Sequence, residues 1–210
     1  MTEQSGPTIR VTENGPYLVD GLEVRDASGE VLDAPDRYAL CRCGGSANKP
    51  FCDGTHARAS FEGAETADHG PIAGRRDDYP GAGVTIHDDR TVCSHAGFCT
   101  GNLAAVFRIG QEPWIDATAA DVDAIVAQVR QCPSGALSVT VDGQPAEADL
   151  PQCVNPVPNG PYRVTGGVQV LAADGSAYEV RNRVTLCRCG GSRNKPFCTG
   201  THWRIHFEAP

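Results

Sequence analysis

The chain has 210 residues, of which 21% are charged and 40% hydrophobic, a balance typical of a folded rather than a disordered protein. Its net charge of −8 argues against nucleic acid as a partner, because that binding needs Lys and Arg to neutralise phosphates. No apolar run approaches the ~20 residues of a membrane helix, and the N-terminus has no basic stretch followed by an apolar run. We therefore expect a cytoplasmic protein with no membrane partner, whose ten cysteines act as ligands rather than in disulfides.

An internal repeat spans both ends of the chain. Asn-Gly-Pro-Tyr at 14–17 recurs at 159–162, and Phe61-Glu62 recurs at 207–208. Short strand-like runs separated by Gly, Pro, Asn and Asp turn signals lie in each copy, at 17–19, 22–24 and 37–40 and again at 162–164, 168–171 and 183–186. The repeat therefore predicts two small β-rich modules with the same fold.

The middle of the chain has its own pattern. A strand is predicted over 83–87, then a cysteine loop and a helix over 102–107. A capping box at Thr118–Asp121 predicts a second helix that ends at Cys132-Pro133, and a closing strand follows at 136–141.

These patterns predict an α+β fold with five segments. They are a first copy (residues 1–63), a linker (64–82), a middle module (83–142), a second linker (143–156) and a second copy (157–210).

Each copy carries a nearly identical ligand-rich stretch. It reads C-R-C-G-G-S-A-N-K-P-F-C-D-G-T-H from Cys41 to His56 and C-R-C-G-G-S-R-N-K-P-F-C-T-G-T-H from Cys187 to His202. Two cysteines two residues apart leave the same face of an extended chain, and a Cys and a His four apart are neighbours on one helical turn. The pairs suit a [2Fe–2S] cluster held by three thiolates and one imidazole, and a Cys₃His zinc site is the alternative. The candidate ligands are Cys41, Cys43, Cys52 and His56 in the first copy and Cys187, Cys189, Cys198 and His202 in the second.

The block C-x-C-x2-S-x3-P-x-C-x-G-T-H, present twice, resembles the motif of the CDGSH iron–sulfur (NEET) family. The resemblance implies a [2Fe–2S] cluster on each set of candidate ligands. It also implies a small β fold in which two motif-bearing halves pair about a two-fold axis, and here both halves lie on one chain. The second copy departs from the family pattern at Thr199, where the first has Asp53. Because an Asp there can support the loop by hydrogen bonds, the two clusters are expected to differ in lability or potential.

The histidine in each set suggests a function. Imidazole ligation raises the potential of a cluster, and a histidine that takes up a proton competes with iron. We therefore hypothesise that His56 and His202 are release or proton-coupling ligands.

The middle module carries a second kind of site. Cys93-x5-Cys99 followed by Cys132-Pro133 has the spacing of a single-cluster bacterial ferredoxin, with Ala96 in place of one cysteine. Three thiolates are enough for a [3Fe–4S] cluster, and His95 is the tentative fourth ligand of a [4Fe–4S] alternative. Three structural cysteines without iron are the remaining interpretation. Residues 83–142 resemble the divergent single-cluster [4Fe–4S] ferredoxin family.

The function expected from these sites is electron transfer. The alternative is a carrier that donates [2Fe–2S] clusters, or a pH and redox sensor that releases them when histidine is protonated. No Gly-rich phosphate loop or nucleophile–base pairing occurs, so no enzyme activity is expected from the chain alone. The expected partner is a reductase, an electron acceptor or an apo iron–sulfur protein, and the expected state is a monomer with internally paired copies. Cys153 is interpreted as a linker cysteine outside the sites.

Overall fold

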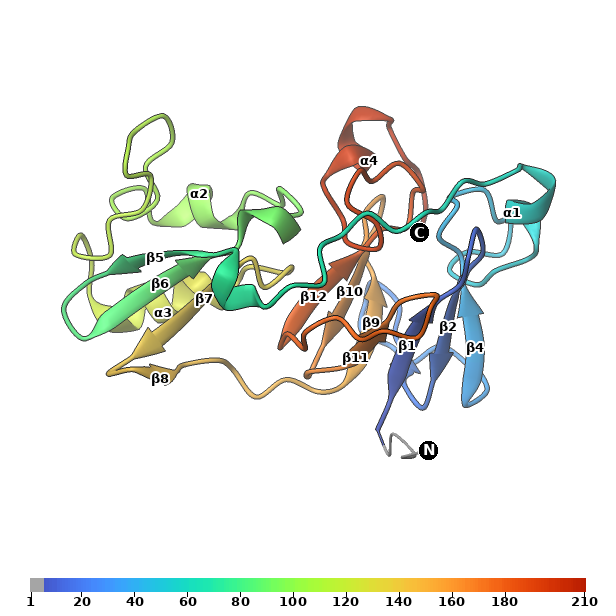
Figure 1. The fold of residues 1–210 in the computed structure, drawn as a ribbon, viewed down its shortest axis with the longest axis horizontal. Helices are drawn as coiled ribbons and strands as arrows, with labels where there is room; N and C mark the ends of the chain where they lie inside the picture. The colour runs from blue at the N-terminus through green and yellow to red at the C-terminus, as the bar shows by residue number, and fades with distance from the viewer. Residues whose placement is uncertain (1–5) are drawn as a thin grey trace.

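The computed structural model describes residues 6–210. The middle module lies at one end of the long axis, the second copy in the centre and the first copy at the other end (Figure 1). The described residues form three four-stranded sheets, one in the middle module and two in the paired copies. The fold is α+β, as predicted, and it is rich in sheet with few and short helices.

The two copies are built from eight short strands. They are β1 (Thr8–Val11), β2 (Tyr17–Asp20), β3 (Glu23–Val24) and β4 (Arg37–Leu40) from the N-terminal part, and β9 (Cys153–Pro156), β10 (Tyr162–Thr165), β11 (Gln169–Leu171) and β12 (Arg183–Leu186) from the C-terminal part. A short helix follows the ligand-rich stretch in each copy, α1 (Thr55–Arg58) and α4 (Thr201–Arg204).

The two copies exchange strands. One sheet has the order β11-β1-β2-β4 and the other β12-β10-β9-β3, so each contains one strand from the opposite copy. Both exchanged strands pair in parallel, β11 with β1 and β3 with β9. Because each sheet is completed by the other copy, the two copies form one body, and the internal pairing expected from the sequence is present.

The core of this body lies between the two sheets. Buried side chains alternate along β1, β2 and β4, as expected of strands buried on one face, whereas every residue of β12 is buried. Ile9, Tyr17 and Leu40 are fully buried in one sheet, and Tyr162 and Leu186 in the other. The rings of Tyr17 and Tyr162 meet edge to face, with their centroids 6.1 Å apart. Such an arrangement lets the positive edge of one ring face the negative face of the other.

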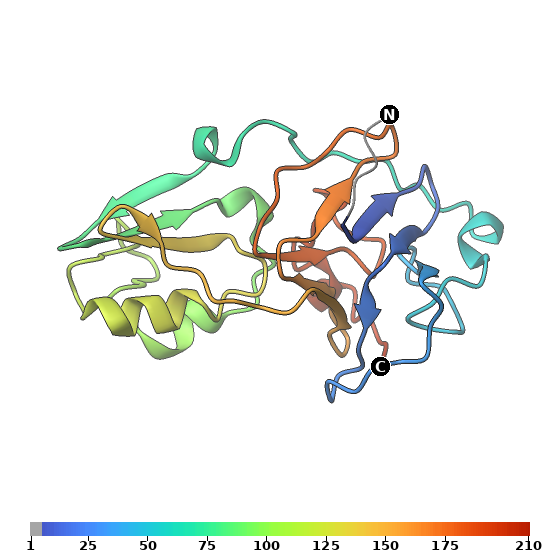
Figure 2. The ribbon, with the colours of Figure 1, turned by 90° about the horizontal axis from the view of Figure 1, so that it is seen from below.

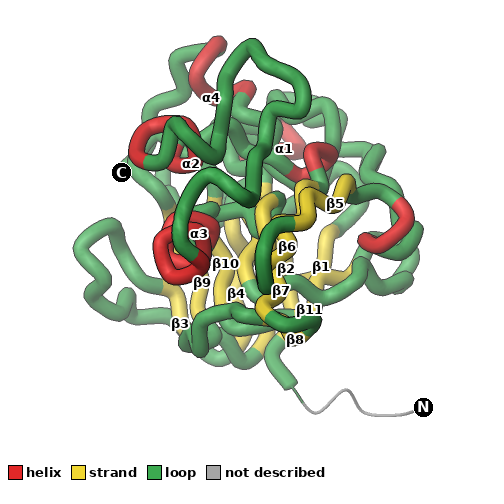
Figure 3. The backbone as a smooth tube through the Cα atoms, turned by 90° about the vertical axis from the view of Figure 1, so that its left-hand side faces the viewer, coloured by secondary structure: helices red, strands yellow, loops and turns green. Residues whose placement is uncertain are grey.

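The middle module is a sheet with helices packed on it. Its strands are β5 (Asp77–Pro80), β6 (Val84–Asp88), β7 (Leu137–Val141) and β8 (Gln144–Pro145), its α-helices are α2 (Phe98–Asn102) and α3 (Val122–Val129), and short 3₁₀ turns lie at Ile72–Gly74 and Arg90–Val92. Helix α3 lies beside β7, with α2 next to it (Figure 3). Ile86 and Val139 pack against Ile125 and Val129 of α3, at the helical spacing that predicted this helix.

Both predicted linkers are shorter in the structure than expected. Residues 77–80 form β5 and residues 144–145 form β8, the two edge strands of the middle sheet. Both contain a proline, which edge strands tolerate and which hides them from a sequence pattern. Cys153 lies in β9 and is only 4% exposed, so it is not a linker residue.

The remaining part of the first linker is packed rather than free. It runs along the outside of the second copy (Figure 2), where the backbone N–H groups of Thr66 and Ala67 donate to the carbonyl of Lys195. His69 stacks on Tyr178 with a centroid separation of 4.0 Å, which gives this histidine a structural role.

The predicted helix over 102–107 is wrong. Helix α2 begins earlier, after Gly97, and ends at Leu103, whose φ of −134° is not helical. Val106 and Phe107 are fully buried, and Phe107 bridges to Ile115. Their burial overrides the local helix preference. The predicted capping box is also absent, since α3 begins after Asp121 rather than Thr118.

No helix within residues 6–210 is both long and apolar enough to cross a membrane.

Candidate metal centres

In the first copy the candidate ligands form two pairs. Strand β4 ends at Leu40, so Cys41 and Cys43 leave its end together, and their Sγ atoms lie 3.7 Å apart. Cys52 and His56 lie at the two ends of the turn that opens α1, with 3.3 Å between Cys52 Sγ and His56 Nδ1. Gly54 allows this turn because its φ is +82°, a conformation that costs glycine little.

The second copy repeats this arrangement. Cys198 Sγ and His202 Nδ1 lie 3.4 Å apart, and the Cys187 and Cys189 thiols share a hydrogen bond. Among residues 6–210 no three His, Cys, Asp or Glu side chains gather closely enough to hold one metal ion. Ligands in separate pairs fit a two-iron cluster, in which each iron takes two protein ligands.

Backbone N–H groups point at the sulfur atoms in both copies. Gly45 N lies 3.4 Å from Cys43 Sγ, and Gly54 N lies 3.5 Å from Cys52 Sγ. Gly200 N lies 3.4 Å from Cys198 Sγ. Hydrogen bonds to ligand sulfur stabilise the thiolate and tune the reduction potential of an iron–sulfur cluster.

Burial and neighbouring thiols shift the pKa values of the candidate ligand cysteines. Burial raises the pKa of Cys198 to about 12 and also raises the pKa of Cys43. The hydrogen bond from Cys189 lowers the pKa of Cys187 to about 6, while the same bond raises the pKa of Cys189. Buried thiolates need positive charge nearby, and bound metal supplies it. The donor set therefore fits an iron–sulfur cluster in each copy.

One of the two positions that differ between the motifs, Asp53 or Thr199, holds the ligand loop in different ways. The Asp53 carboxylate accepts from the N–H groups of Ala47 (2.9 Å) and Thr55 (3.0 Å), and the bond from Ala47 is the main cause of its lowered pKa. Thr199 instead makes hydroxyl contacts with Ser192 (3.3 Å) and Thr201 (3.1 Å). At this position only the first copy has a carboxylate that braces its ligand loop.

We expect that Asp53→Thr speeds loss of the cluster from the first copy. The substitution removes the hydrogen bond from Ala47 that joins the two halves of the ligand loop and the local bond from Thr55, and charge-assisted bonds are the stronger kind. The rate of bleaching of the visible absorbance after addition of an iron chelator measures the effect. Thr199→Asp is the reciprocal variant and should slow loss from the second copy. Equal bleaching of Asp53→Thr and the parent protein would show that the carboxylate does not support the loop.

Two tyrosines that sequence reasoning did not single out connect the copies. The Tyr17 hydroxyl donates to the carbonyl of Cys187 (2.9 Å), and the Tyr162 hydroxyl donates to the carbonyl of Cys41 (2.8 Å). Each tyrosine thus holds the ligand loop of the opposite copy. Their identical place in the repeat, three residues after Asn14 or Asn159, was the signal that could have found them.

The arginine between the first two cysteines of each motif was missed too. Arg42 is buried and donates to the carbonyls of Gly15, Gly63 and Thr12 at 2.6–2.8 Å. Arg188 donates to the carbonyls of Val157 and Pro210 in the second copy, while its Nε is buried without a partner. Each guanidinium therefore anchors its ligand loop through backbone carbonyls.

The two ligand loops touch each other. Cys43 and Cys189 form an antiparallel β-bridge. A Cβ on Gly44 would lie 2.8 Å from the Cys189 carbonyl oxygen, and one on Gly190 would lie 2.9 Å from that of Cys43. Only glycine permits this approach, so the Gly-Gly pair of each motif serves the contact between the two sites.

The three cysteines of the middle module surround one cavity. Cys93, Cys99 and Cys132 line a space of about 220 Å³ with His95 and Trp114. Burial raises the pKa of Cys93 and Cys99. The His95 N–H lies 3.4 Å from Cys93 Sγ and the Leu137 N–H lies 3.5 Å from Cys132 Sγ. Three convergent thiols with N–H donors fit a ferredoxin-type cluster.

Arg90 closes one side of this cavity. Its guanidinium lies 3.9 Å from Cys93 Sγ, pairs with Asp88 at 2.9 Å and covers the Trp114 ring at 4.1 Å from the centroid. It therefore places a fixed positive charge beside the thiols, where a cluster with thiolate ligands carries negative charge.

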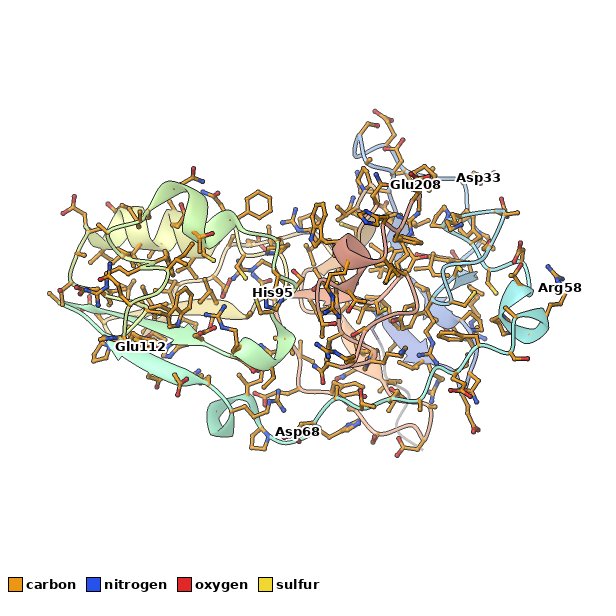
Figure 4. All side chains as sticks on the ribbon, turned by 90° about the horizontal axis from the view of Figure 1, so that it is seen from above. Asp33, Arg58, Asp68, His95, Glu112 and Glu208 are labelled. Carbon is orange, nitrogen blue, oxygen red and sulfur yellow. The ribbon has the colours of Figure 1, made fainter. Side chains whose placement is uncertain are left out.

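The middle site lies against the second copy. A Cβ on Gly200 would lie 3.0 Å from the Ser94 carbonyl oxygen and 3.6 Å from His95 Nδ1. Figure 4 shows His95 where the middle module meets the second copy. His202 and Cys198 are consequently buried, at 5% and 3% exposure, whereas Cys52 and His56 are half-buried.

Cys153 and His87 lie outside these sites. Cys153 Sγ contacts the Thr165 hydroxyl at 3.3 Å within the sheet. His87 is buried against Asp78, with 2.6 Å between Nδ1 and the carboxylate. The contacts of both side chains are therefore structural.

The fold and the paired ligands define an iron–sulfur protein. The family model described as iron-binding zinc finger CDGSH type matches residues 14–57 and 159–203, and the one described as divergent 4Fe-4S mono-cluster matches residues 79–142. The chain belongs to the CDGSH iron–sulfur (NEET) family and carries a divergent single-cluster 4Fe–4S domain between two CDGSH modules.

Two curated relatives are similar over part of the chain. "Uncharacterized protein YjdI" of Escherichia coli strain K12 is 32% identical over 59 residues, which is 28% of this chain and 78% of the relative. The protein of the same name from Escherichia coli O157:H7 matches with the same values.

Proposed function

We propose that the protein is an electron carrier with a [2Fe–2S] cluster in each CDGSH module and a ferredoxin-type cluster in the middle module. The proposed ligands are the two motif sets together with Cys93, Cys99 and Cys132. The observation that carries the proposal is the contact between successive sites. The Ser94–His95 loop touches Gly200, and Cys189 touches Cys43. When bound, the clusters supply one-electron centres.

The burial of the candidate ligands differs along the row of sites. Cys198 and His202 of the second copy are buried between the middle module and the first copy, while the matching Cys52 and His56 of the first copy are half-buried at the far end. The two ends of the row are therefore the places where a partner can approach. We propose a redox protein, a reductase or an acceptor, as the partner, and no catalytic site on the chain itself.

Repeated redox cycling tests this function. The holo-protein is reduced with dithionite and reoxidised by air-free ferricyanide over several cycles, and bound iron is measured after each one. An electron carrier keeps its iron through every cycle. Iron lost in the first cycle would contradict the proposal.

The second candidate function is donation of [2Fe–2S] clusters. The half-buried Cys52 and His56 favour it, because an acceptor protein can reach them. A donor loads an apo-ferredoxin faster than free iron and sulfide do. His56→Cys should slow this transfer, since a thiolate does not leave iron on protonation as readily as an imidazole. Transfer at the same rate would remove the histidine from the release step.

The number of irons in the middle cluster decides the role of His95. The matched family description favours a [4Fe–4S] cluster, and His95 lines the cavity of the three cysteines. We expect about eight irons per chain, the sum of two [2Fe–2S] clusters and one [4Fe–4S] cluster. His95→Ala should lower the count by about one iron and produce the EPR signal of an oxidised [3Fe–4S] cluster. About seven irons in the parent protein would instead give the [3Fe–4S] form with no fourth ligand.

We also propose the cytoplasm as the compartment and a monomer as the solution state. Light scattering of the holo-protein measures the latter, and a mass near the 22.2 kDa of one chain is expected.

A further inference from the structure

A second cavity lies where the middle module packs on the second copy. It encloses about 610 Å³ and lies outside the three-cysteine cavity. Ala96 and Phe98 border it from the middle module, and Trp203 and His202 border it from α4. We call this space the α4 groove. Its volume lies within the range of about 300–1,000 Å³ typical of sites for small molecules.

The α4 groove is aromatic at its rim. Phe98 and Trp203 are 51% and 62% exposed, which is unusual for such large apolar side chains. The Trp203 ring lies beside the imidazole of His202, with 5.0 Å between centroids. A flat ring that packs on Trp203 therefore lies next to a proposed ligand of the second cluster.

The α4 groove is also positively charged, in a chain whose net charge is −8. Arg130 and Arg163 line it, and no Asp or Glu does. Within residues 6–210 neither guanidinium forms an ion pair with a carboxylate. Arg130 donates to the backbone carbonyls of Ala146 and Glu147, and Nε of Arg163 is buried without a partner. Two uncompensated guanidinium groups favour an anionic ligand.

The internal repeat supplies an independent comparison. Arg163 corresponds to Leu18 and Trp203 to Ala57, although the surrounding motifs are nearly identical. The side chains that make the groove basic and aromatic therefore occur only in the copy on which the middle module packs.

We propose that the α4 groove binds a planar aromatic anion, with its ring on Trp203 and its acidic group on Arg163 and Arg130. The ligand's role rests on the proposed function. We assign it as a small electron donor or acceptor for the site of the second copy, where Cys198 and His202 are buried. A quinone that bears a sulfonate, carboxylate or phosphate group has this chemistry.

The test uses anthraquinone disulfonate as the probe and the oxidised holo-protein in calorimetry. We expect one saturable site per chain, weakened by added salt because the contacts are ionic. The double variant Arg163→Leu/Trp203→Ala gives the second copy the residues of the first. Its affinity should fall by about tenfold or more, the effect of about 1.4 kcal/mol of lost binding energy. Arg58→Gln is the control, since Arg58 is exposed on α1 at the opposite end of the molecule (Figure 4).

Three results would overturn the groove proposal: no saturable binding, an unchanged affinity in the double variant, or an equal loss in Arg58→Gln. Arg163→Gln and Arg130→Gln are milder variants that each should weaken binding if the double variant is poorly folded.

A second readout separates this proposal from the electron-carrier function. Reduction of the quinone to the hydroquinone takes two electrons from the dithionite-reduced protein and two protons from solvent. Binding without this reaction would contradict the role as donor or acceptor and the carrier function behind it, while leaving the groove as a binding site. Reaction at an unchanged rate in the double variant would contradict the groove and leave the carrier function standing.

Discussion

Gly44→Ala is expected to destabilise the paired copies far more than Gly54→Ala. Both glycines have a left-handed backbone, with φ of +80° and +82°, so alanine pays the same conformational cost of about 1–2 kcal/mol at either site. A Cβ at Gly54 meets nothing within 4 Å, whereas one at Gly44 lies 2.8 Å from the Cys189 carbonyl oxygen. That oxygen belongs to backbone of the other copy and cannot rotate away. We expect an additional loss of about 1–3 kcal/mol, the usual cost of overpacking.

Urea unfolding of the holo-proteins measures this difference in the free energy of unfolding. Because the loops of the two sites share the Cys43–Cys189 contact, Gly44→Ala should also hasten loss of both clusters. Equal stability of the two variants would mean that the ligand loops do not depend on each other.

Removing the second copy's site is expected to isolate the middle site from the first copy. The variant Cys187→Ser/Cys198→Ser takes one ligand from each pair of the central site. In the structure the middle loop contacts the second copy's ligand loop through Ser94 and Gly200. Electrons placed on the middle cluster should then fail to reach the first copy on the time scale of the parent protein. Freeze-quench EPR after limiting reduction follows the two centres separately.

The matched control is Cys41→Ser/Cys52→Ser, the same change in the first copy. It removes the terminal site and should leave exchange between the middle module and the second copy intact. If the first copy is reduced equally fast with and without the central site, the sites work in parallel and the row of contacts has no role in transfer.

The ligand sets could be predicted because they depend on short-range geometry. Cys41 and Cys43 follow a strand, and Cys52 and His56 share one helical turn, so spacing alone predicts which pairs come together. Strands β4 and β12 were predicted with the observed bounds for the same reason, since each reads as one short run before a cysteine. The helix at 122–129 was predicted from its apolar period.

The pairing of strands could not be predicted in this way. The run at 22–24 was predicted as a strand without a partner, and β3 pairs with β9 some 130 residues later. Strand β9 lies in a segment that was predicted to be a linker, because Pro and polar residues interrupt the strand pattern. The helix expected at 102–107 failed because Val106 and Phe107 are held by burial in the middle core rather than by local preference.

The sequence by itself predicted the candidate chemistry: the motif-bearing stretches, their candidate ligands and the pairing of two like modules, since all of these depend on spacings of a few residues and on a repeat. The tertiary structure alone decided their order and their surroundings. Which copy the middle module covers, which ligand pair is buried and where Arg163 meets Trp203 depend on contacts between residues far apart in the chain. Such contacts produce no periodic pattern in the sequence, because they depend on the shapes and charges of surfaces that exist only after folding.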